Sequence, residues 1–367
     1  MCFLVNTMLP LISIVKAQED TWETLASMPT PKAGLGVAAV NGKIYAIGSG
    51  TINQEYDPVT DTWTTKAPMP TSRAHFGIAT IQNKIYVMGG LQEGSPLSVN
   101  EEYDPVTDTW TTKAPMPTAR GQTSAAVSNN KIYVTGGIVY VNPGNVDSCS
   151  KMEVYDPITD AWITKSDMLH SEADHTSAGI GTKIYVIGGQ ELQIYDVKTD
   201  TWSQGTNSPQ PQENAAVGII IDSMGRELII NLGGGVQFSI NVINQLYYPQ
   251  SDTWLSGAPM PTARKNLAVV VVDNYVYAIG GHVESGSHSV YDYFKPTATV
   301  ERYTSLLTYS SLPIPTPTPS LDPTSTPTSS PEPSDVEFPI LIVASIIIIA
   351  VCSIAILAYD IKTKRRS

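Results

Sequence analysis

Residues Glu102–Trp110 read EYDPVTDTW, and this phrase decides the fold because the chain repeats it. The copies recur every 40 to 50 residues or so, the spacing of repeat architectures. They are Glu55–Trp63 (EYDPVTDTW), Val154–Trp162 (VYDPITDAW), Ile194–Trp202 (IYDVKTDTW) and Leu246–Trp254 (LYYPQSDTW). Asp and Pro favour a tight turn, whereas Tyr and Trp favour strands. Each copy therefore predicts the end of one strand, a turn and the start of the next strand.

A second phrase, an apolar run that ends in paired glycines, precedes each copy by a variable gap. It occurs at Lys43–Gly50, Lys84–Gly90, Lys131–Gly137, Lys183–Gly189, Glu227–Gly234 and Tyr275–Gly281. Another apolar run stands before each of these, usually joined to it by a pair such as Asn41-Gly42 or Asn129-Asn130. Asn and Gly tolerate the positive φ that a two-residue hairpin requires. One repeat thus predicts four antiparallel strands.

Paired glycines, then a Tyr, then a Trp, at this spacing in four-stranded units, resemble the kelch repeat. The resemblance covers roughly residues 21–305. It implies an all-β fold, a kelch-type β-propeller with one repeat in each blade around a central channel. Six glycine pairs, one of them interrupted as Gly48-Ser49-Gly50, predict six blades.

The sixth repeat is incomplete, and the chain offers its missing part at the other end. Residues Thr299–Thr304 (TVERYT) are not followed by the D-P-x-T-D-x-W phrase, whereas Trp22 in Glu19–Trp22 (EDTW) precedes any glycine pair. We expect Trp22 to begin the outer strand of blade six. An N-terminal strand would then close the ring and protect its terminal edges.

Residues 1–18 precede the predicted propeller, which spans residues 19–309. They are mostly apolar and end near Val15-Lys16-Ala17, a pattern typical of a cleaved secretory signal peptide. The basic segment that normally begins such a peptide is absent. An uncleaved anchor or a ragged terminus is therefore the alternative interpretation.

The C-terminal part changes composition twice. Residues 310–337 are rich in Pro, Thr and Ser and predict an extended stalk without a core. Residues 338–359 carry no charge and are long enough for a transmembrane helix. The basic tail, residues 360–367, predicts a cytoplasmic C-terminus with the propeller outside the cell membrane. A sorting signal whose helix is later removed remains open.

Charge and cysteine content limit the possible partners. Residues 19–337 hold 17 of the 22 basic and 33 of the 34 acidic residues of the chain. This acidity argues against nucleic acid as a partner. Of the three cysteines, only Cys149 falls in the predicted propeller, so no internal disulfide is expected there.

The connections between strands two and three differ greatly in length, which marks their face as the ligand face. Blade four has almost none, whereas Gly137–Met152 and His282–Ala298 are long. These long loops bring aromatic residues to that face: Tyr140, Phe238, Tyr291, Tyr293 and Phe294. They suit contact with a sugar or peptide, or they pack under their own loops.

The connections between blades carry a second pattern, M-P-T-x-R. Counting 16 residues back from each glycine pair gives Lys32, Arg73, Arg120, Glu172 and Arg264, while the blade-five phrase aligns Asn214 there. Two positions later come Gly34, His75, Gln122, Asp174, Ala216 and Asn266, which we expect to open strand one. The polar members of both sets, at the channel mouth, are the candidate ligand residues, together with His282 and Tyr291 on the long loop of blade six. The alternative is that the arginines are structural and bond loop carbonyls.

Two functions follow from this arrangement. The first is a cell-surface recognition module for a glycan or protein ligand, held off the membrane by the stalk. The second is an extracytoplasmic sugar-active enzyme of the mutarotase or epimerase kind, suggested by a likeness to sialic-acid mutarotases. No cofactor and no metal are predicted. His170, Asp174 and His175 form the densest cluster of possible ligands, yet their spacing matches no metal motif, and the two-His site of kelch-like copper oxidases is not recognisable.

Overall fold

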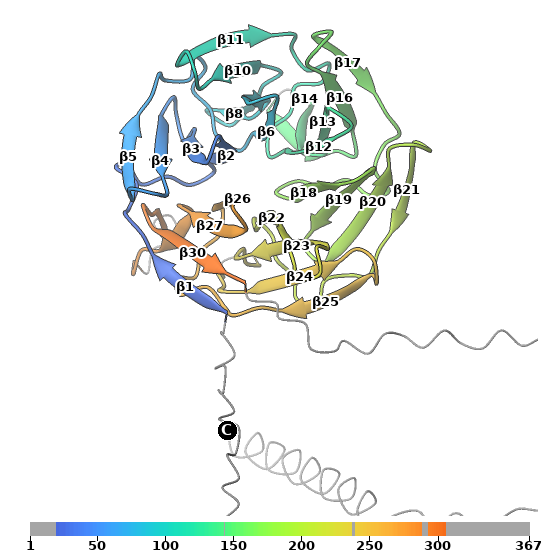
Figure 1. Ribbon diagram of the computed structural model, residues 1–367. Helices are drawn as coiled ribbons and strands as arrows, with labels where there is room; N and C mark the ends of the chain where they lie inside the picture. The colour runs from blue at the N-terminus through green and yellow to red at the C-terminus, as the bar shows by residue number, and fades with distance from the viewer. Residues whose placement is uncertain (1–19, 143, 237–238, 288–292, 306–367) are drawn as a thin grey trace, which may run out of the picture. The chain divides into compact units, whose positions relative to one another are not determined.

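The computed structural model describes residues 20–142, 144–236, 239–287 and 293–305. They form six antiparallel four-stranded sheets arranged as blades around a central axis (Figure 1). The first strand of each blade is the innermost, and the first strands of neighbouring blades contact one another around the axis. The predicted all-β, six-bladed propeller is confirmed.

The blades follow one another along the chain. Blade one consists of β2 (Gly36–Val40), β3 (Lys43–Ile47), β4 (Asn53–Asp57) and β5 (Thr62–Thr65). Blade two consists of β6 (Gly77–Ile81), β7 (Lys84–Met88), β10 (Asn100–Asp104) and β11 (Thr109–Lys113). Blade three consists of β12 (Ser124–Ser128), β13 (Lys131–Thr135), β16 (Met152–Asp156) and β17 (Ala161–Thr164).

The second half of the ring has the same order. Blade four consists of β18 (Thr176–Ile180), β19 (Lys183–Gly188), β20 (Glu191–Asp196) and β21 (Thr201–Gln204). Blade five consists of β22 (Ala216–Ile221), β23 (Glu227–Leu232), β24 (Asn244–Tyr248) and β25 (Thr253–Ser256). Blade six consists of β26 (Ala268–Val272), β27 (Tyr275–Ile279), β30 (Val300–Thr304) and β1 (Thr21–Thr24).

Three small hairpins project from the connections between second and third strands. They are β8 (Leu91–Gln92) with β9 (Ser95–Pro96), β14 (Ile138–Asn142) with β15 (Asn145–Ser148), and β28 (His282–Glu284) with β29 (Phe294–Pro296). All three lie in blades with long connections, so the uneven loops carry local structure of their own.

The repeated phrase joins each blade to its predecessor. In blade two the Tyr103 hydroxyl donates to Asp108 Oδ1 at 2.6 Å, and the same oxygen accepts the Ala67 N–H at 2.8 Å. Trp110 Nε1 donates to the Ala67 carbonyl at 2.9 Å. Asp108 has φ of 54°, a conformation that Asp adopts more readily than most residues. The phrase is thus a turn and an inter-blade contact at once.

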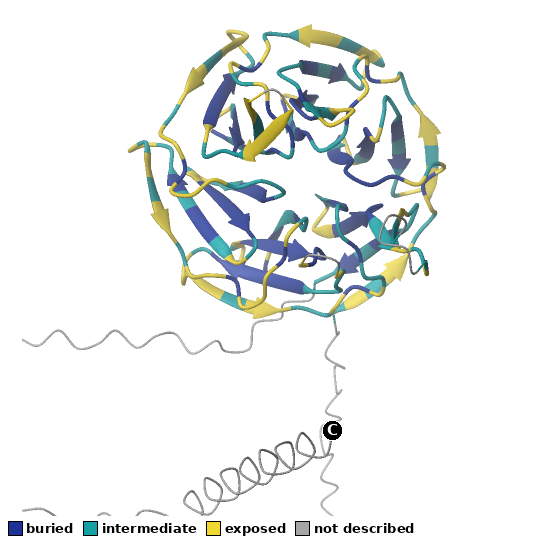
Figure 2. Cartoon of the chain, turned by 180° about the vertical axis from the view of Figure 1, so that it is seen from behind, coloured by how far each residue is buried: buried dark blue, intermediate teal, exposed yellow. Residues whose placement is uncertain are grey.

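The hydrophobic core lies between neighbouring sheets. Between blades one and two, for example, it contains Ile47, Val87 and Tyr103, which are fully buried. The Tyr103 and Trp110 rings lie 5.0 Å apart between centroids, and this tilted pairing recurs in every blade. Figure 2 shows buried inner strands and largely exposed outer strands. Each blade is therefore held by packing on both faces.

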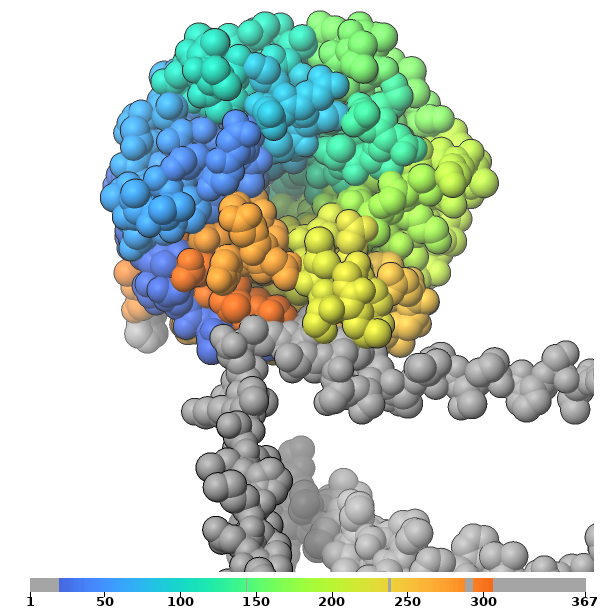
Figure 3. All heavy atoms as spheres, viewed as in Figure 1, coloured from blue at the N-terminus to red at the C-terminus, as the bar shows by residue number. Residues whose placement is uncertain are grey.

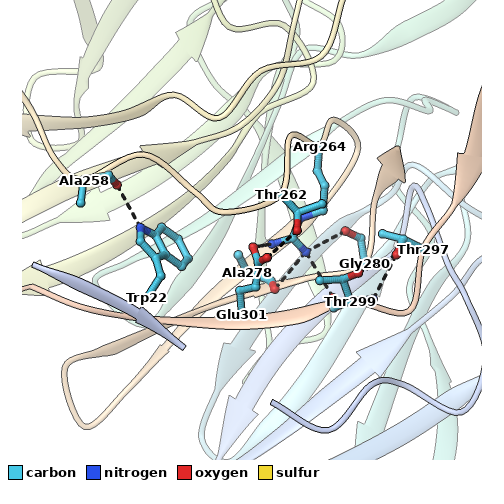
Figure 4. A network of polar contacts seen from close by, with 9 residues as sticks. All are labelled: Trp22, Ala258, Thr262, Arg264, Ala278, Gly280, Thr297, Thr299 and Glu301. Atoms are coloured by element: carbon cyan, nitrogen blue, oxygen red, sulfur yellow. Dashed lines mark hydrogen bonds and ion pairs between the residues drawn. The ribbon is translucent and has the colours of Figure 1, made fainter. Parts of the chain in front are cut away.

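The N-terminal strand closes the ring, as predicted. β1 pairs with β30, with Thr21 opposite Thr304. The Tyr303 hydroxyl donates to Asp20 Oδ2 at 2.6 Å, and Trp22 Nε1 donates to the Ala258 carbonyl at 3.0 Å (Figure 4). Asp20 and Trp22 thus supply the aspartate and tryptophan that blade six lacks. The repeated phrase is completed by residues from opposite ends of the propeller.

The predicted signal peptide, stalk, transmembrane helix and basic tail, at residues 1–18, 310–337, 338–359 and 360–367, lie outside the described residues. Over the part of the chain that is described, no helix has the length and apolar character that crossing a bilayer requires.

Candidate functional site

Six residues, one from each blade, form a closed circle of main-chain hydrogen bonds at one mouth of the channel. We call it the mouth ring; its members are Gly34, His75, Gln122, Asp174, Asn214 and Asn266. Each N–H donates to the carbonyl of the ring residue in the preceding blade, over 2.7 to 3.3 Å. All six have φ between 52° and 63°. Left-handed geometry suits Gly, Asn and Asp best, and four of the six positions carry one of them.

The structure corrects two details of the sequence alignment here. The ring residues do not open the first strands, because β6 begins at Gly77, two residues after His75. In blade five the ring residue is Asn214 rather than Ala216. The reason is a longer hairpin: Ala216 pairs with Leu232, 16 positions on, whereas Ala268 of blade six pairs with Ile279, 11 positions on. Counting back from the glycine pair therefore fails in that blade.

The cations predicted at the mouth are buried inside their blades instead. Lys32, Arg73, Arg120 and Arg264 are only 0 to 2% exposed. Arg120 donates to the carbonyls of Gly136 (2.8 Å) and Lys151 (3.0 Å) and to the Glu153 carboxylate (2.9 Å). Arg264 repeats this arrangement with Gly280, Thr299 and Glu301 (Figure 4). These contacts are those of the structural alternative, an arginine that bonds loop carbonyls.

The threonine of the M-P-T-x-R pattern completes the same buried group. Thr118 Oγ1 donates to Glu153 Oε1 at 2.6 Å, so Arg120 and Thr118 satisfy both carboxylate oxygens. The equivalent contacts join Thr71 and Arg73 to Glu101, and Thr262 and Arg264 to Glu301. A buried charge is tolerated only when it is paired and hydrogen-bonded, which explains the spacing of this pattern. Sequence reasoning missed the glutamates, although each lies two residues before the repeat tyrosine.

The three remaining blades lack both members of this ion pair. Glutamine replaces glutamate in each of them, at Gln54, Gln193 and Gln245. The arginine position holds Lys32 in blade one, Glu172 in blade four and Gln212 in blade five. Buried Lys32 donates to the Ala46 carbonyl at 3.0 Å, and burial lowers its pKa to about 7. Gln212, which the sequence alignment passed over, donates to the Gly233 carbonyl at 2.8 Å.

Asp174 is the charged member of the mouth ring. Gln122 Nε2 donates to its Oδ2 at 2.9 Å. Burial raises the pKa of Asp174 to about 6, and nearby Glu213 adds to the increase while Lys265 opposes it. The carboxyl group of Asp174 is thus influenced both by a neighbouring carboxylate and by a neighbouring ammonium group.

Glu172 differs from its counterparts in the other blades because it is only partly buried. Its carboxylate lies against Gly188, where a Cβ atom would come within 2.2 Å of Oε2. Burial, and then the neighbouring Glu191, raise the pKa of Glu172 to about 7. His170 Nδ1 contacts Glu191 Oε2 at 2.7 Å. Blade four therefore has two neighbouring carboxylates, Glu172 and Glu191, at the mouth. Blades two, three and six instead have a buried arginine at the position of Glu172.

Blade six contributes the basic and aromatic part of the mouth. Asn266 Nδ2 lies 3.4 Å from His282 Nδ1, and burial lowers the pKa values of His75 and His282. The Lys265 ammonium lies 4.0 Å from the ring centroid of Phe294. The predicted ligand residue Tyr291, like Phe238, lies outside the described residues.

The channel continues below the mouth ring. A cavity of about 80 Å³ lies at the ring, and one of about 200 Å³ lies deeper between the first strands. Blades three and four supply the polar side of the deeper cavity: Thr123, Ser124, His175, Thr176 and Ser177. The other blades supply glycine and apolar residues, among them Phe76 and Leu267. Figure 3 shows the central opening between the blades.

No cluster of three or more His, Cys, Asp or Glu side chains suited to a metal ion occurs within the described ranges. In particular, His170 contacts Glu191, whereas the His175 ring contacts the Thr135 hydroxyl at 2.9 Å. The two histidines are therefore bound to different partners.

The fold and the ring of residues at the channel mouth together define a class of protein, the six-bladed β-propeller built from repeats with paired glycines. The Kelch motif family matches residues 72–117, 119–169, 173–209 and 263–303. Kelch-like protein 35 of Mus musculus is 28% identical over 165 residues, covering 42% of this chain and 27% of that protein. Kelch-like protein 23 of Homo sapiens is 28% identical over 140 residues, covering 35% and 23%. The chain belongs to the kelch-repeat β-propeller family, whose propellers are commonly protein-interaction modules.

A solved structure titled "Structure of YjhT" superposes with a TM-score of 0.64 at 19% identity, covering 75% of this chain and 95% of that one. At this identity the likeness concerns the fold alone. The matched stretches of the two kelch-like proteins amount to about a quarter of their length, so activities of the whole relatives do not transfer directly.

Proposed function

We propose that the protein is a cell-surface recognition module that binds a glycan or protein ligand on one face of the propeller. We call this the loop face; it carries the connections between second and third strands and those between blades. The opposite turn face carries the connections between strands one and two and between strands three and four.

The observation that carries the proposal is the contrast between these faces. Every turn between strands three and four within blades one to five has four residues, such as 105–108. The connections between second and third strands range from two residues in blade four (189–190) to 20 in blade six (280–299). Uniform turns suit a scaffold, whereas variable loops on one side of a repeat fold suit ligand binding.

The ends of the propeller support this choice. Thr21 begins β1 and lies opposite Thr304, the last residue of β30, so both chain ends leave at the turn face. The loop face is therefore free of the ends of the described chain. This arrangement suits a surface protein tethered through its terminal segments, as the sequence predicts.

Ligand binding and location are tested separately. For binding, the full-length chain is applied to glycan and protein arrays, and any hit is measured again after replacing residues 138–148 or 282–298 with short glycine linkers. A loop-face ligand loses affinity with at least one replacement and keeps it with the turn-face control Lys198→Ala. For location, cells that express the chain are treated with a protease that does not enter them; digestion of the propeller is expected, and its protection would contradict a surface position.

A second candidate, a sugar-active enzyme, is favoured by one observation. Glu172 has a pKa near neutrality, which suits a general acid or base, and a second carboxylate, Glu191, lies beside it. An enzyme would show catalysed anomer exchange, by NMR saturation transfer on reducing sugars, that disappears in Glu172→Gln. Unchanged exchange in that variant would reject this candidate.

A further inference from the structure

The hairpin β14–β15 of blade three is the most apolar exposed element of the described loop face. Tyr140, Val141 and Val146 are 50, 53 and 43% exposed. The hairpin forms a two-stranded sheet of its own, which meets the rest of the loop face at few points. Ile138 at its base bridges to Gly121, and the Tyr140 hydroxyl donates to Ser95 Oγ of β9 at 2.9 Å. Figure 2 shows its exposure. A two-stranded hairpin is marginal by itself, and grouped exposed apolar side chains commonly mark a contact surface.

The base of this hairpin is hydrogen-bonded to Ser171 and Glu172, in the connection that leads into blade four. The Glu172 N–H donates to the Cys149 carbonyl at 3.3 Å, and the Gly137 N–H donates to the Glu172 carbonyl at 2.7 Å. Ser148 Oγ donates to Ser171 Oγ at 3.2 Å. The apolar hairpin therefore adjoins Glu172 directly, and the two are held in a fixed relation.

Blade four forms a low edge beside the hairpin, since only Gly189 and Gln190 connect β19 to β20. Along this edge lie Glu172, Glu191 and Glu213. Burial and then the charges of Glu191 and Glu213 raise the pKa of Glu172. His170 contacts Glu191, and Lys265, in the connection that leads into neighbouring blade six, lies near enough to Glu213 for the two charges to interact. We call these three glutamates the acidic edge.

We propose that the β14–β15 hairpin and the acidic edge together dock a basic, partly apolar segment of a partner protein. The inference rests on the proposed function and names the ligand as a protein. Apolar side chains of the segment cover Tyr140, Val141 and Val146, while its Lys or Arg side chains reach the three glutamates.

Charge complementarity selects this occupant over the others. Asp147 on the hairpin and the acidic edge repel anionic lipid headgroups and acidic glycans. A second copy of this chain would bring the same negative charge to the contact. A cationic segment is attracted instead, and its arrival stabilises the ionised form of Glu172. A ligand for this surface needs both positive charge and apolar side chains, and a basic, partly apolar protein segment has both.

The test uses a random 12-residue peptide library displayed on phage and selected on the immobilised full-length chain. Selected peptides are expected to carry net positive charge together with apolar residues, and to release at high salt. They should bind the double variant Tyr140→Ser/Val146→Ser, and separately Glu191→Gln, at least about tenfold more weakly, the size of loss typical of important interface side chains.

Matched controls lie on the turn face. Val59 and Val106 are 91 and 79% exposed there, so Val59→Ser/Val106→Ser removes similar apolar surface away from the hairpin. Glu227→Gln removes a carboxylate at the start of β23. Neither control should change peptide affinity. All substituted residues are exposed or partly exposed, and thermal unfolding verifies that each variant keeps its fold.

The titration of Glu172 adds a readout that a purely structural role would not give. Its pKa of about 7 predicts that affinity for a selected peptide rises between pH 6 and pH 8 as the carboxylate ionises. Glu172→Gln should reduce this rise.

The peptide experiment overturns the proposal if no peptide is selected, if the selected peptides are acidic or uncharged, or if the hairpin variant binds them as well as the parent chain does. A natural ligand that depends on residues 282–298 but not on the hairpin would also overturn it while leaving the proposed function standing. A protein without any ligand on the loop face would overturn both.

Discussion

Replacement of Arg120 by Gln isolates the energy of one buried ion pair in blade three. The Arg120 side chain is fully buried and contacts three backbone carbonyls as well as Glu153. Glutamine is shorter and uncharged, so Glu153 would remain buried without its cation. Breaking a buried pair in this way costs about 3–5 kcal/mol.

The double variant Arg120→Gln/Glu153→Gln tests the reason for that cost. It reproduces the glutamine pair that blade five already holds at Gln212 and Gln245. We expect it to lose only about 1–2 kcal/mol, since no unpaired charge remains and the loss is that of a few hydrogen bonds. Urea unfolding followed by tryptophan fluorescence measures both free energies.

The exposed ion pair Lys151–Asp167 is the control. Lys151→Gln should cost less than about 1 kcal/mol, because solvent screens this pair. The reasoning is refuted if the double variant is as unstable as the sum of the two single variants. It is also refuted if Arg120→Gln costs no more than Lys151→Gln.

Three further predictions concern closure, the mouth ring and pH. Trp22→Ala removes the ring contact with Tyr303 and the hydrogen bond to Ala258. We expect it to lower the free energy of unfolding by about 3 kcal/mol and to speed hydrogen exchange of the β30 amides. Unchanged protection of β30 would contradict closure by β1. Asn266 has φ of 52°, a left-handed conformation that glycine adopts more easily than alanine. Asn266→Ala should therefore lower the free energy of unfolding by about 1 kcal/mol, and Asn266→Gly by less. Thermal melts that give the reverse order would contradict this explanation. Because the pKa of Glu172 is raised to about 7 in the folded protein, it adds stability that is complete below about pH 4 and is lost as the pH rises through 7. The melting temperature should therefore fall between pH 5 and pH 8, and less steeply in Glu172→Gln. Equal slopes in the two proteins would show that Glu172 does not cause the fall.

Sequence periodicity was sufficient for the architecture because the repeated residues make the contacts that define it. Tyr103, Asp108 and Trp110 bond one another or the preceding blade, so their spacing reports strand, turn and inter-blade contact together. The same logic places Trp22 in blade six, where its indole N–H donates to the Ala258 carbonyl. The spacing of the repeated residues therefore specifies both the strands of each blade and the closure of the ring of blades.

The chemistry of the mouth was harder to predict because it depends on residues far apart in sequence. The sequence left open whether Arg120 faces a ligand or is structural, and its contact with Glu153, 33 positions away, is what the pattern did not reveal. In blade five the longer hairpin between β22 and β23 prevents counting from the glycine pair, and alignment by the phrase put Asn214 at the arginine position, which Gln212 holds. What the sequence did contain was a covariation: Glu accompanies Arg in three blades, and Gln appears wherever Arg is absent.

The shared sheet of blade six also determines how the propeller responds to mechanical load. β30 lies between β27 and β1, with hydrogen-bonded partners along both edges. A pull on the end of β30 at Thr304 would load the hydrogen bonds along both of its edges, to β27 and to β1. The N-terminal strand therefore braces the last strand of the described propeller.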